Sequence, residues 1–135
     1  MRKLLAALAI LSLASLDDVQ AIDFTPTGSV INVSYIEPTQ NTDNSALNDL
    51  AKTTINWRVC PVSGTCSAVY TKVDVAASAL VGGGSISRDV TVPVTPGQEV
   101  NVEVFATATD LSGNVSPESV HVVKRVDRLS PKAPA

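Results

Sequence analysis

Apolar and polar residues alternate with a period of two in several short stretches of this chain. The clearest stretches are residues 31–35, 55–59, 90–94 and 100–109, where β-branched residues predominate at the apolar positions. Successive side chains of a β-strand point to opposite faces, so this alternation predicts strands that are buried on one face. Three further strands are expected at residues 22–25, 69–75 and 119–126.

Turn-forming residues separate these stretches. Residues 95–97 read Thr-Pro-Gly and residues 111–114 read Leu-Ser-Gly-Asn, both typical of tight turns. Residues 82–84 are three glycines, which we interpret as a flexible connector. Residues 47–52 and 75–80 have room for one helical turn each, but not for a helix that packs. The pattern therefore predicts an all-β chain, an antiparallel sandwich of about seven strands.

The N-terminus has the layout of a secretory signal peptide. Arg2 and Lys3 precede an apolar stretch over residues 4–16, and small residues lead to Ala21. The stretch is about 13 residues long, shorter than the roughly 20 that a membrane-spanning helix needs. We expect cleavage after Ala21, with a cut after Ala14 or an uncleaved buried helix as alternatives.

This interpretation divides the chain into a signal peptide at residues 1–21, one sandwich domain at 22–127 and a disordered, proline-rich tail at 128–135. The exported chain is expected to be secreted or periplasmic, with no membrane span. The formal net charge is −3 at pH 7, and the lysines and arginines are not clustered. Nucleic-acid binding is therefore not expected, because it needs concentrated positive charge.

The two cysteines, Cys60 and Cys66, are predicted to form a disulfide, as expected for a pair in an exported protein. Proline, serine and glycine between them suggest a hairpin loop, so that the bridge joins two strands at their turn end. Closing so short a loop stabilises the fold by about 2–3 kcal/mol at most. The spacing is not that of a redox or zinc motif, which makes those the weaker alternatives.

Two stretches resemble bacterial fibronectin type III domains. The stretch VSYIEPTQNTDNSALNDLAKTTINW, residues 33–57, resembles the family's B strand, B–C loop and C strand. The stretch PGQEVNVEVFATATDLSGNVSPES, residues 96–119, is similar to its F strand, F–G turn and the start of its G strand. This resemblance implies a fibronectin type III-like, and hence immunoglobulin-like, sandwich.

The chain departs from the family pattern at several positions. Tyr35 stands where the family usually has a core tryptophan, while Trp57 supplies a large ring from the next strand. Val102 stands where a tyrosine hydroxyl commonly ties down the preceding corner, so we expect a looser corner at residues 95–98. Asn44 replaces a loop glycine, and asparagine tolerates positive φ better than other non-glycine residues.

Catalysis is not expected. His121 is the only histidine, it lies in a predicted strand, and neither a nucleophile motif nor an orienting acid is expected beside it. The acidic residues are scattered over loops and outward strand positions, and the three glycines lack the Lys-Ser/Thr that completes a phosphate loop. We therefore predict that the chain is not an enzyme and carries no cofactor.

The segment NTDNSALNDL, residues 41–50, has the composition of a calcium loop but not the spacing. Counted from Asp43, an EF-hand needs glycine at the sixth position and glutamate at the twelfth, where this chain has Asn48 and Thr54. A looser site made by Asp43, Ser45 and Asp49 stays open. The simpler interpretation is that these side chains form turns by bonding to their own backbone.

The residues expected to make contacts lie in two loops, 40–49 and 75–84. The candidates are Asp43, Asn44, Ser45, Asn48, Asp49, Ala79 and Gly83. Tyr70 and Phe105 are expected to be exposed aromatics on neighbouring strands and to form a second contact patch.

The function predicted from these features is that of an exported, non-catalytic binding or structural module, which recognises a protein or glycan through loops on a rigid sandwich. A carbohydrate-binding module is the main alternative, and the low aromatic content of 4% weakens it. A small hydrolase or a metal-dependent enzyme is a weaker alternative. The sequence does not indicate which partner is bound.

Overall fold

The computed structural model describes residues 21–135, so the predicted signal peptide lies outside the described residues except for Ala21. This part of the chain is all-β, as predicted, and has seven strands. They are β1 (Asp23–Thr27), β2 (Val30–Ile36), β3 (Leu50–Pro61), β4 (Thr71–Ala76), β5 (Ser85–Thr91), β6 (Glu99–Asp110) and β7 (Val122–Asp127). Within residues 21–135 no helix has the length and apolarity needed to cross a membrane.

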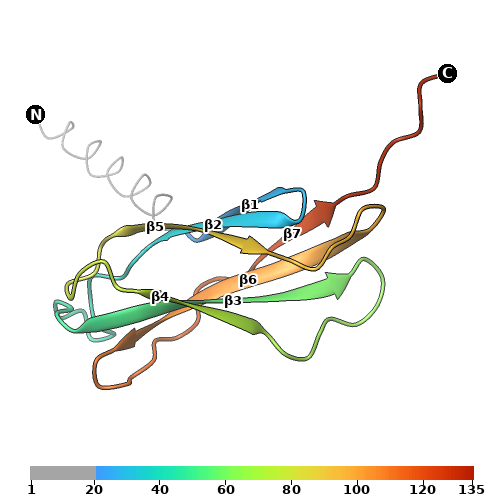
Figure 1. Ribbon diagram of the computed structural model, residues 1–135. Helices are drawn as coiled ribbons and strands as arrows, with labels where there is room; N and C mark the ends of the chain where they lie inside the picture. Colours follow the sequence, from blue (N-terminus) through green and yellow to red (C-terminus); the bar gives the residue numbers. More distant parts are fainter. Residues whose placement is uncertain (1–20) are drawn as a thin grey trace, which may run out of the picture.

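The strands form two antiparallel sheets that pack face to face. One has the order β1-β2-β5 and the other the order β4-β3-β6-β7, and Figure 1 shows them as two layers. β3 and β6 are the longest strands and pair along their length, from Leu50 beside Asp110 to Pro61 beside Val100. The predicted sandwich of seven antiparallel strands is therefore confirmed for the described residues.

The core is a single cluster of apolar side chains from both sheets. Ile31 and Val33 of β2 face Ile55, Val102 and Val104 of the larger sheet, and each is fully buried. These are the apolar positions of the predicted alternation, because one face of each strand meets the other sheet. Burial of this face supplies the main stabilisation of the fold.

One predicted strand is displaced along the chain. The strand expected at residues 90–94 is β5, which ends at Thr91. Val90, Val92 and Val94 are nevertheless all buried, so the apolar pattern continues past the end of the strand. Pro93 explains the difference, because it has no N–H to donate to a neighbouring strand.

The disulfide between Cys60 and Cys66 is present, but it does not join two strands as expected. Cys60 lies near the end of β3, whereas Cys66 lies in the loop and β4 begins only at Thr71. The Ser67 N–H donates to the carbonyl oxygen of Val59, which keeps the chain folded back on β3 as a loop.

Arg128 fastens the corner that precedes β6. Its N–H donates to the carbonyl oxygen of Gln98, its guanidinium donates to that of Val94, and its own carbonyl accepts from Gly97. Arg128 therefore supplies bonds at the corner that was expected to be loose, and contacts of the sandwich extend one residue into the predicted tail.

The three glycines between β4 and β5 are not a slack connector. Gly82 has φ = 68°, and a Cβ on it would lie 1.9 Å from the carbonyl oxygen of Pro38. A Cβ on Gly84 would lie 2.2 Å from Oγ of Ser78. Glycine is needed at these positions because the Pro38 backbone leaves no room for a side chain at residue 82, and the Ser78 and Glu37 side chains leave none at residue 84.

We predict that Gly82→Ala destabilises the fold much more than Gly97→Ala. Both glycines have positive φ, but nothing lies within 4 Å of a Cβ at Gly97. Gly97→Ala should lower the free energy of unfolding by about 1–2 kcal/mol, the cost of the left-handed backbone. Gly82→Ala should cost at least about 2 kcal/mol more because of the clash with Pro38. Equal losses in denaturant unfolding would contradict this account of the loop.

Candidate functional site

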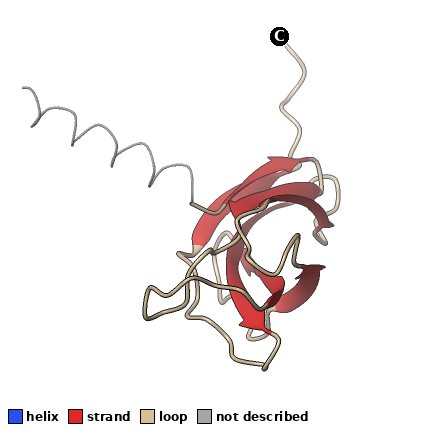
Figure 2. Cartoon of the chain, turned by 90° about the vertical axis from the view of Figure 1, so that its left-hand side faces the viewer, coloured by secondary structure: helices blue, strands red, loops and turns tan. Residues whose placement is uncertain are grey.

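Three loops gather at one end of the sandwich. They are the β2–β3 loop (residues 37–49), the β4–β5 loop (77–84) and the β6–β7 loop (111–121). The antiparallel order places them together, because β2, β4 and β6 end where β3, β5 and β7 begin. Figure 2 views the molecule from this end, with the loops in front of the strands. We call it the loop end.

Backbone hydrogen bonds fasten the three loops to one another. The Leu50 N–H donates to the carbonyl oxygen of Leu80, and the Leu111 N–H donates to that of Asp49. Both predicted contact loops therefore lie side by side. Among the predicted contact residues, Asp49 is half-buried and the others are exposed, namely Asp43, Asn44, Ser45, Asn48, Ala79 and Gly83.

Glu37 is the anchor of the β4–β5 loop. Its side chain is 1% exposed and lies just after β2. Its carboxylate accepts hydrogen bonds from the Ser78 N–H at 2.9 Å, the Ser78 hydroxyl and the Gly84 N–H at 3.0 Å. Burying a charge without such bonds would be very costly. Sequence analysis missed this residue, whose one signal is an acid that directly follows an apolar strand.

The β2–β3 loop is shaped by its own side chains. Asp43 Oδ1 accepts from both the N–H and the hydroxyl of Ser45, which holds the pKa of Asp43 below its ordinary value. Asn44, which replaces a loop glycine of the resembled family, has φ = 71°, a backbone conformation that asparagine tolerates. Leu47 and Leu50 are buried beneath the loop. The hydrogen bonds of Asp43 agree with the interpretation that the polar side chains of this loop form turns by bonding to nearby backbone.

Two adjoining cavities open at this end. A cavity of about 270 Å³ lies between the end of β2 and residues 116–119, where the hydroxyls of Tyr35 and Thr53 lie 2.6 Å apart. A second cavity of about 290 Å³ lies between the β2–β3 and β6–β7 loops. We call this second cavity the loop hollow. Pro38 and Ser116 line both cavities, so the two form neighbouring recesses.

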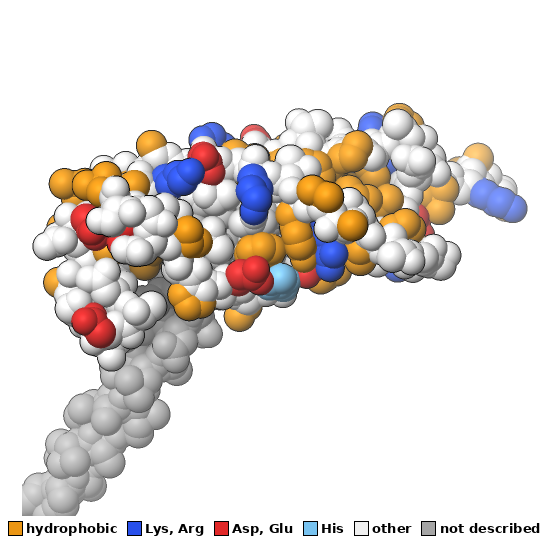
Figure 3. Space-filling model, turned by 90° about the horizontal axis from the view of Figure 1, so that it is seen from below, with side chains coloured by type: hydrophobic (Ala, Val, Ile, Leu, Met, Phe, Trp, Pro, Cys, Tyr) orange, Lys and Arg blue, Asp and Glu red, His pale blue; other side chains and the backbone are white. Residues whose placement is uncertain are grey.

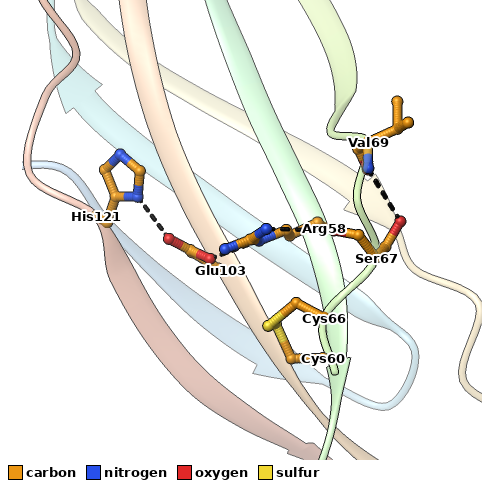
Figure 4. Close-up of a disulfide and its surroundings, with 7 residues drawn as sticks. All are labelled: Arg58, Cys60, Cys66, Ser67, Val69, Glu103 and His121. Carbon is orange, nitrogen blue, oxygen red and sulfur yellow. Dashed lines mark hydrogen bonds and ion pairs between the residues drawn. A yellow bond between two sulfur atoms is a disulfide. The ribbon is translucent and has the colours of Figure 1, made fainter. Parts of the chain in front are cut away.

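A group of charged and aromatic side chains lies on the outer face of the four-stranded sheet, near the disulfide (Figure 4). Glu103 Oε1 accepts from Nε of Arg58 at 2.7 Å, and its Oε2 lies 2.5 Å from Nδ1 of His121. Nε2 of His121 lies 2.8 Å from a carboxylate oxygen of Glu118. The expectation that no acid lies beside His121 is therefore wrong. The pairing of β6 with β7 explains it, because Glu103 lies opposite Val123, two residues along the chain from His121. Arg58 reaches the same carboxylate because it is the cross-strand partner of Glu103 in β3.

The predicted exposed aromatics do meet, but one of them is covered. The ring centroids of Tyr70 and Phe105 are 5.0 Å apart. Phe105 is only 5% exposed, so the prediction of an exposed ring is wrong. His121 stacks on it with centroids 4.3 Å apart, and the Arg58 guanidinium lies 4.6 Å from the centre of the Tyr70 ring. Figure 3 shows charged, histidine and hydrophobic side chains together on this face.

These charges stabilise one another. Hydrogen bonds with Glu103 and Glu118 raise the pKa of His121 above its ordinary value. Hydrogen bonds from His121 and Arg58 lower the pKa of Glu103. A raised pKa favours the protonated form of His121, and a protonated imidazole cannot act as a general base. Of the described residues, Cys60, Cys66 and Glu103 also form a group with metal-ligand spacing, but the disulfide occupies both sulfur atoms.

No family model matches this chain, and a search among curated proteins finds no match.

We predict that Glu37→Ala loosens the β4–β5 loop and lowers the free energy of unfolding by about 2–4 kcal/mol, because the N–H groups of Ser78 and Gly84 lose their acceptor. Glu37→Gln should cost less, since its remaining oxygen still accepts. Denaturant unfolding and amide hydrogen exchange at Gly84 measure the two effects. Unchanged exchange at Gly84 in Glu37→Ala would show that the carboxylate is not the anchor.

We also predict that the fold loses stability as the pH rises above 6.5, the ordinary pKa of histidine. The folded pKa of His121 is raised, so its stabilising contribution is complete below the unfolded pKa and is lost as the pH rises through the folded value. His121→Phe keeps a ring on Phe105 but cannot titrate. Its free energy of unfolding should therefore be nearly constant over this range, and a slope equal to that of the wild type would disprove the assignment to His121.

Proposed function

We propose that this chain is an exported, non-catalytic binding module on a fibronectin type III-like sandwich, and that it binds a protein partner through the loop end. The observation that carries the proposal is the bonding of three loops to one another at one end of a packed sandwich. A rigid scaffold that presents ordered loops is a common basis for recognition, because little entropy is lost on binding.

The strand order supports the fibronectin type III-like assignment. In immunoglobulin-like sandwiches the A, B and E strands share one sheet and the C, F and G strands share the other. Numbered in chain order, β1, β2 and β5 correspond to the first group, and β3, β6 and β7 to the second. The two stretches that resemble the family fall on β2 to β3 and on β6 with its following loop.

The disulfide and the domain boundary support export. Disulfides persist in oxidising compartments, so the bridge fits a secreted or periplasmic protein. Ala21 is exposed, whereas Ile22 is 5% exposed and belongs to the core. Cleavage after Ala21 would therefore leave every core residue in the mature chain.

The glycan alternative has less support. Carbohydrate-binding surfaces stack sugars on exposed aromatic faces, but Phe105 is covered by His121 and Tyr70 lies beneath Arg58. The loop end instead presents backbone, amide and carboxylate groups beside exposed Leu80, Val81 and Leu111, a mixture typical of protein interfaces.

Site-specific photo-cross-linking in the producing cells tests the proposal. A photoreactive amino acid at Ala79 or Asn48, both exposed at the loop end, should cross-link the same partner protein. The same amino acid at Ser63, exposed at the opposite end, is the matched control and should not. Equal cross-linking from Ser63, or none from Ala79 and Asn48, would count against recognition by the loop end.

A further inference from the structure

The loop hollow has an apolar floor and a polar rim. Leu47 and Leu50 of the floor are 6% and 2% exposed, and Pro38 forms a wall. Asn41 of the β2–β3 loop and Asp110 at the end of β6 stand on opposite sides of the rim. A recess of this kind suits a ligand with an apolar stem and a polar head.

Asp110 and Asn41 both offer acceptor atoms to a ligand at the rim. Asp110 Oδ1 accepts from the N–H groups of Ser112 and Asn114, and Oδ2 accepts from Nδ2 of Asn114 at 3.0 Å. A carboxylate can accept about four hydrogen bonds, so it has capacity for another. Asn41 uses its Nδ2 on the Ser45 hydroxyl and the Ala46 carbonyl, which leaves its Oδ1.

The Asp110 carboxylate is fixed and ionised. The hydrogen bonds from Asn114 and the neighbouring backbone hold its pKa below the ordinary value. Its position is set before any ligand arrives, because three donors hold it in the turn after β6. Pre-organisation of this kind lowers the cost of binding a cation.

The surrounding loops carry more negative than positive charge. Residues 37–51, 77–84 and 110–121 contain five acidic residues and no lysine or arginine: Glu37, Asp43, Asp49, Asp110 and Glu118. Their one histidine, His121, is paired with Glu118 and with Glu103 of β6. Lys52 follows the first loop but is bonded to Asp74. The potential at the loop end therefore attracts a basic partner and disfavours an acidic one.

We infer that the loop hollow receives the side chain of a lysine or arginine displayed by the partner protein. The methylene stem would lie on Leu47, Leu50 and Pro38, and the charged head would donate to Asp110 and Asn41 Oδ1. The inference rests on the proposed function and narrows it, since it specifies the chemistry of the partner's central contact.

The test uses a defined probe on the purified, disulfide-bonded protein. Nα-acetyl-lysine methylamide is titrated while the side-chain amide signals of Asn41 and Asn114 are followed by NMR. These signals should shift in a saturable way. Nα-acetyl-norleucine methylamide has a similar stem without the charge, so equal shifts with this second probe would overturn the inference.

Two matched variants separate the Asp110 contact from general electrostatics. Asp110→Asn and Asp43→Asn each remove one negative charge and keep an oxygen for the turn bonds. Asp110→Asn should weaken binding of the lysine probe about tenfold, the usual effect of losing a charged hydrogen-bond partner. Asp43→Asn should change it less than about twofold, because Asp43 does not line the hollow. Equal losses in both variants would overturn the inference.

A third variant does not disturb the turn at Asp110. Thr42 is exposed and lines the hollow, so in Thr42→Lys the new ammonium group should occupy the recess and abolish binding of the lysine probe. Undiminished probe binding would overturn the inference.

The photo-cross-linking experiment distinguishes failure of the inference about the loop hollow from failure of the proposed function. Cross-links from Ala79 and Asn48 without probe binding would overturn this inference and leave the binding module standing. Probe binding without those cross-links would support the specificity of the hollow and count against the proposed function.

Discussion

The pairing of β3 with β6 is the constraint on which the rest of the structure depends. Its register places Leu50 beside Asp110 at one end and Arg58 beside Glu103 farther along. The first pair brings the β2–β3 loop against the β6–β7 loop, and the loop hollow lies between them. The second pair joins Arg58 to Glu103, and the pairing of β6 with β7 then brings His121 to the same carboxylate. A shift of this register by one residue would exchange the core and solvent faces of a strand. The burial of Ile55 and Val104 therefore fixes the register, and with it the positions of the polar side chains at the loop end and around Glu103.

Glu37 adds a fastening that strand pairing alone does not provide. The β4–β5 loop joins strands of different sheets and therefore has no ladder to hold it. A buried carboxylate at the end of β2 accepts hydrogen bonds from two backbone N–H groups of that loop. These bonds hold the β4–β5 loop against residues 37 and 38, where Gly82 closely approaches Pro38. The three loops are consequently bonded into one continuous surface instead of forming three independent connections.

The strands could be predicted because the alternation of apolar and polar residues within each strand shows which of its faces is buried. The valines within residues 100–109 occupy every second position, and this pattern can be read without knowing which strands lie beside them. Asn44 has a positive φ, which its residue type tolerates. Glu37, Glu103 and Phe105 could not be placed in this way. Their burial and partners depend on which strand lies opposite and in which register, and that information is spread over distant parts of the chain. The same reason explains why Phe105 points outward, as its alternation predicts, and is nevertheless covered by His121.

The two polar groups differ in what they leave for a partner. On the outer face, Glu103 is shared by Arg58 and His121, so the strongest charges of that group are already paired within the chain. A partner would have to break these pairs and bury the charges, which costs more than it returns. At the loop hollow, Asp110 is held by turn donors that are neutral, and its negative charge has no cationic partner among those contacts. The proposed recognition is therefore placed at the loop end, because the fold has fixed a charge there without neutralising it.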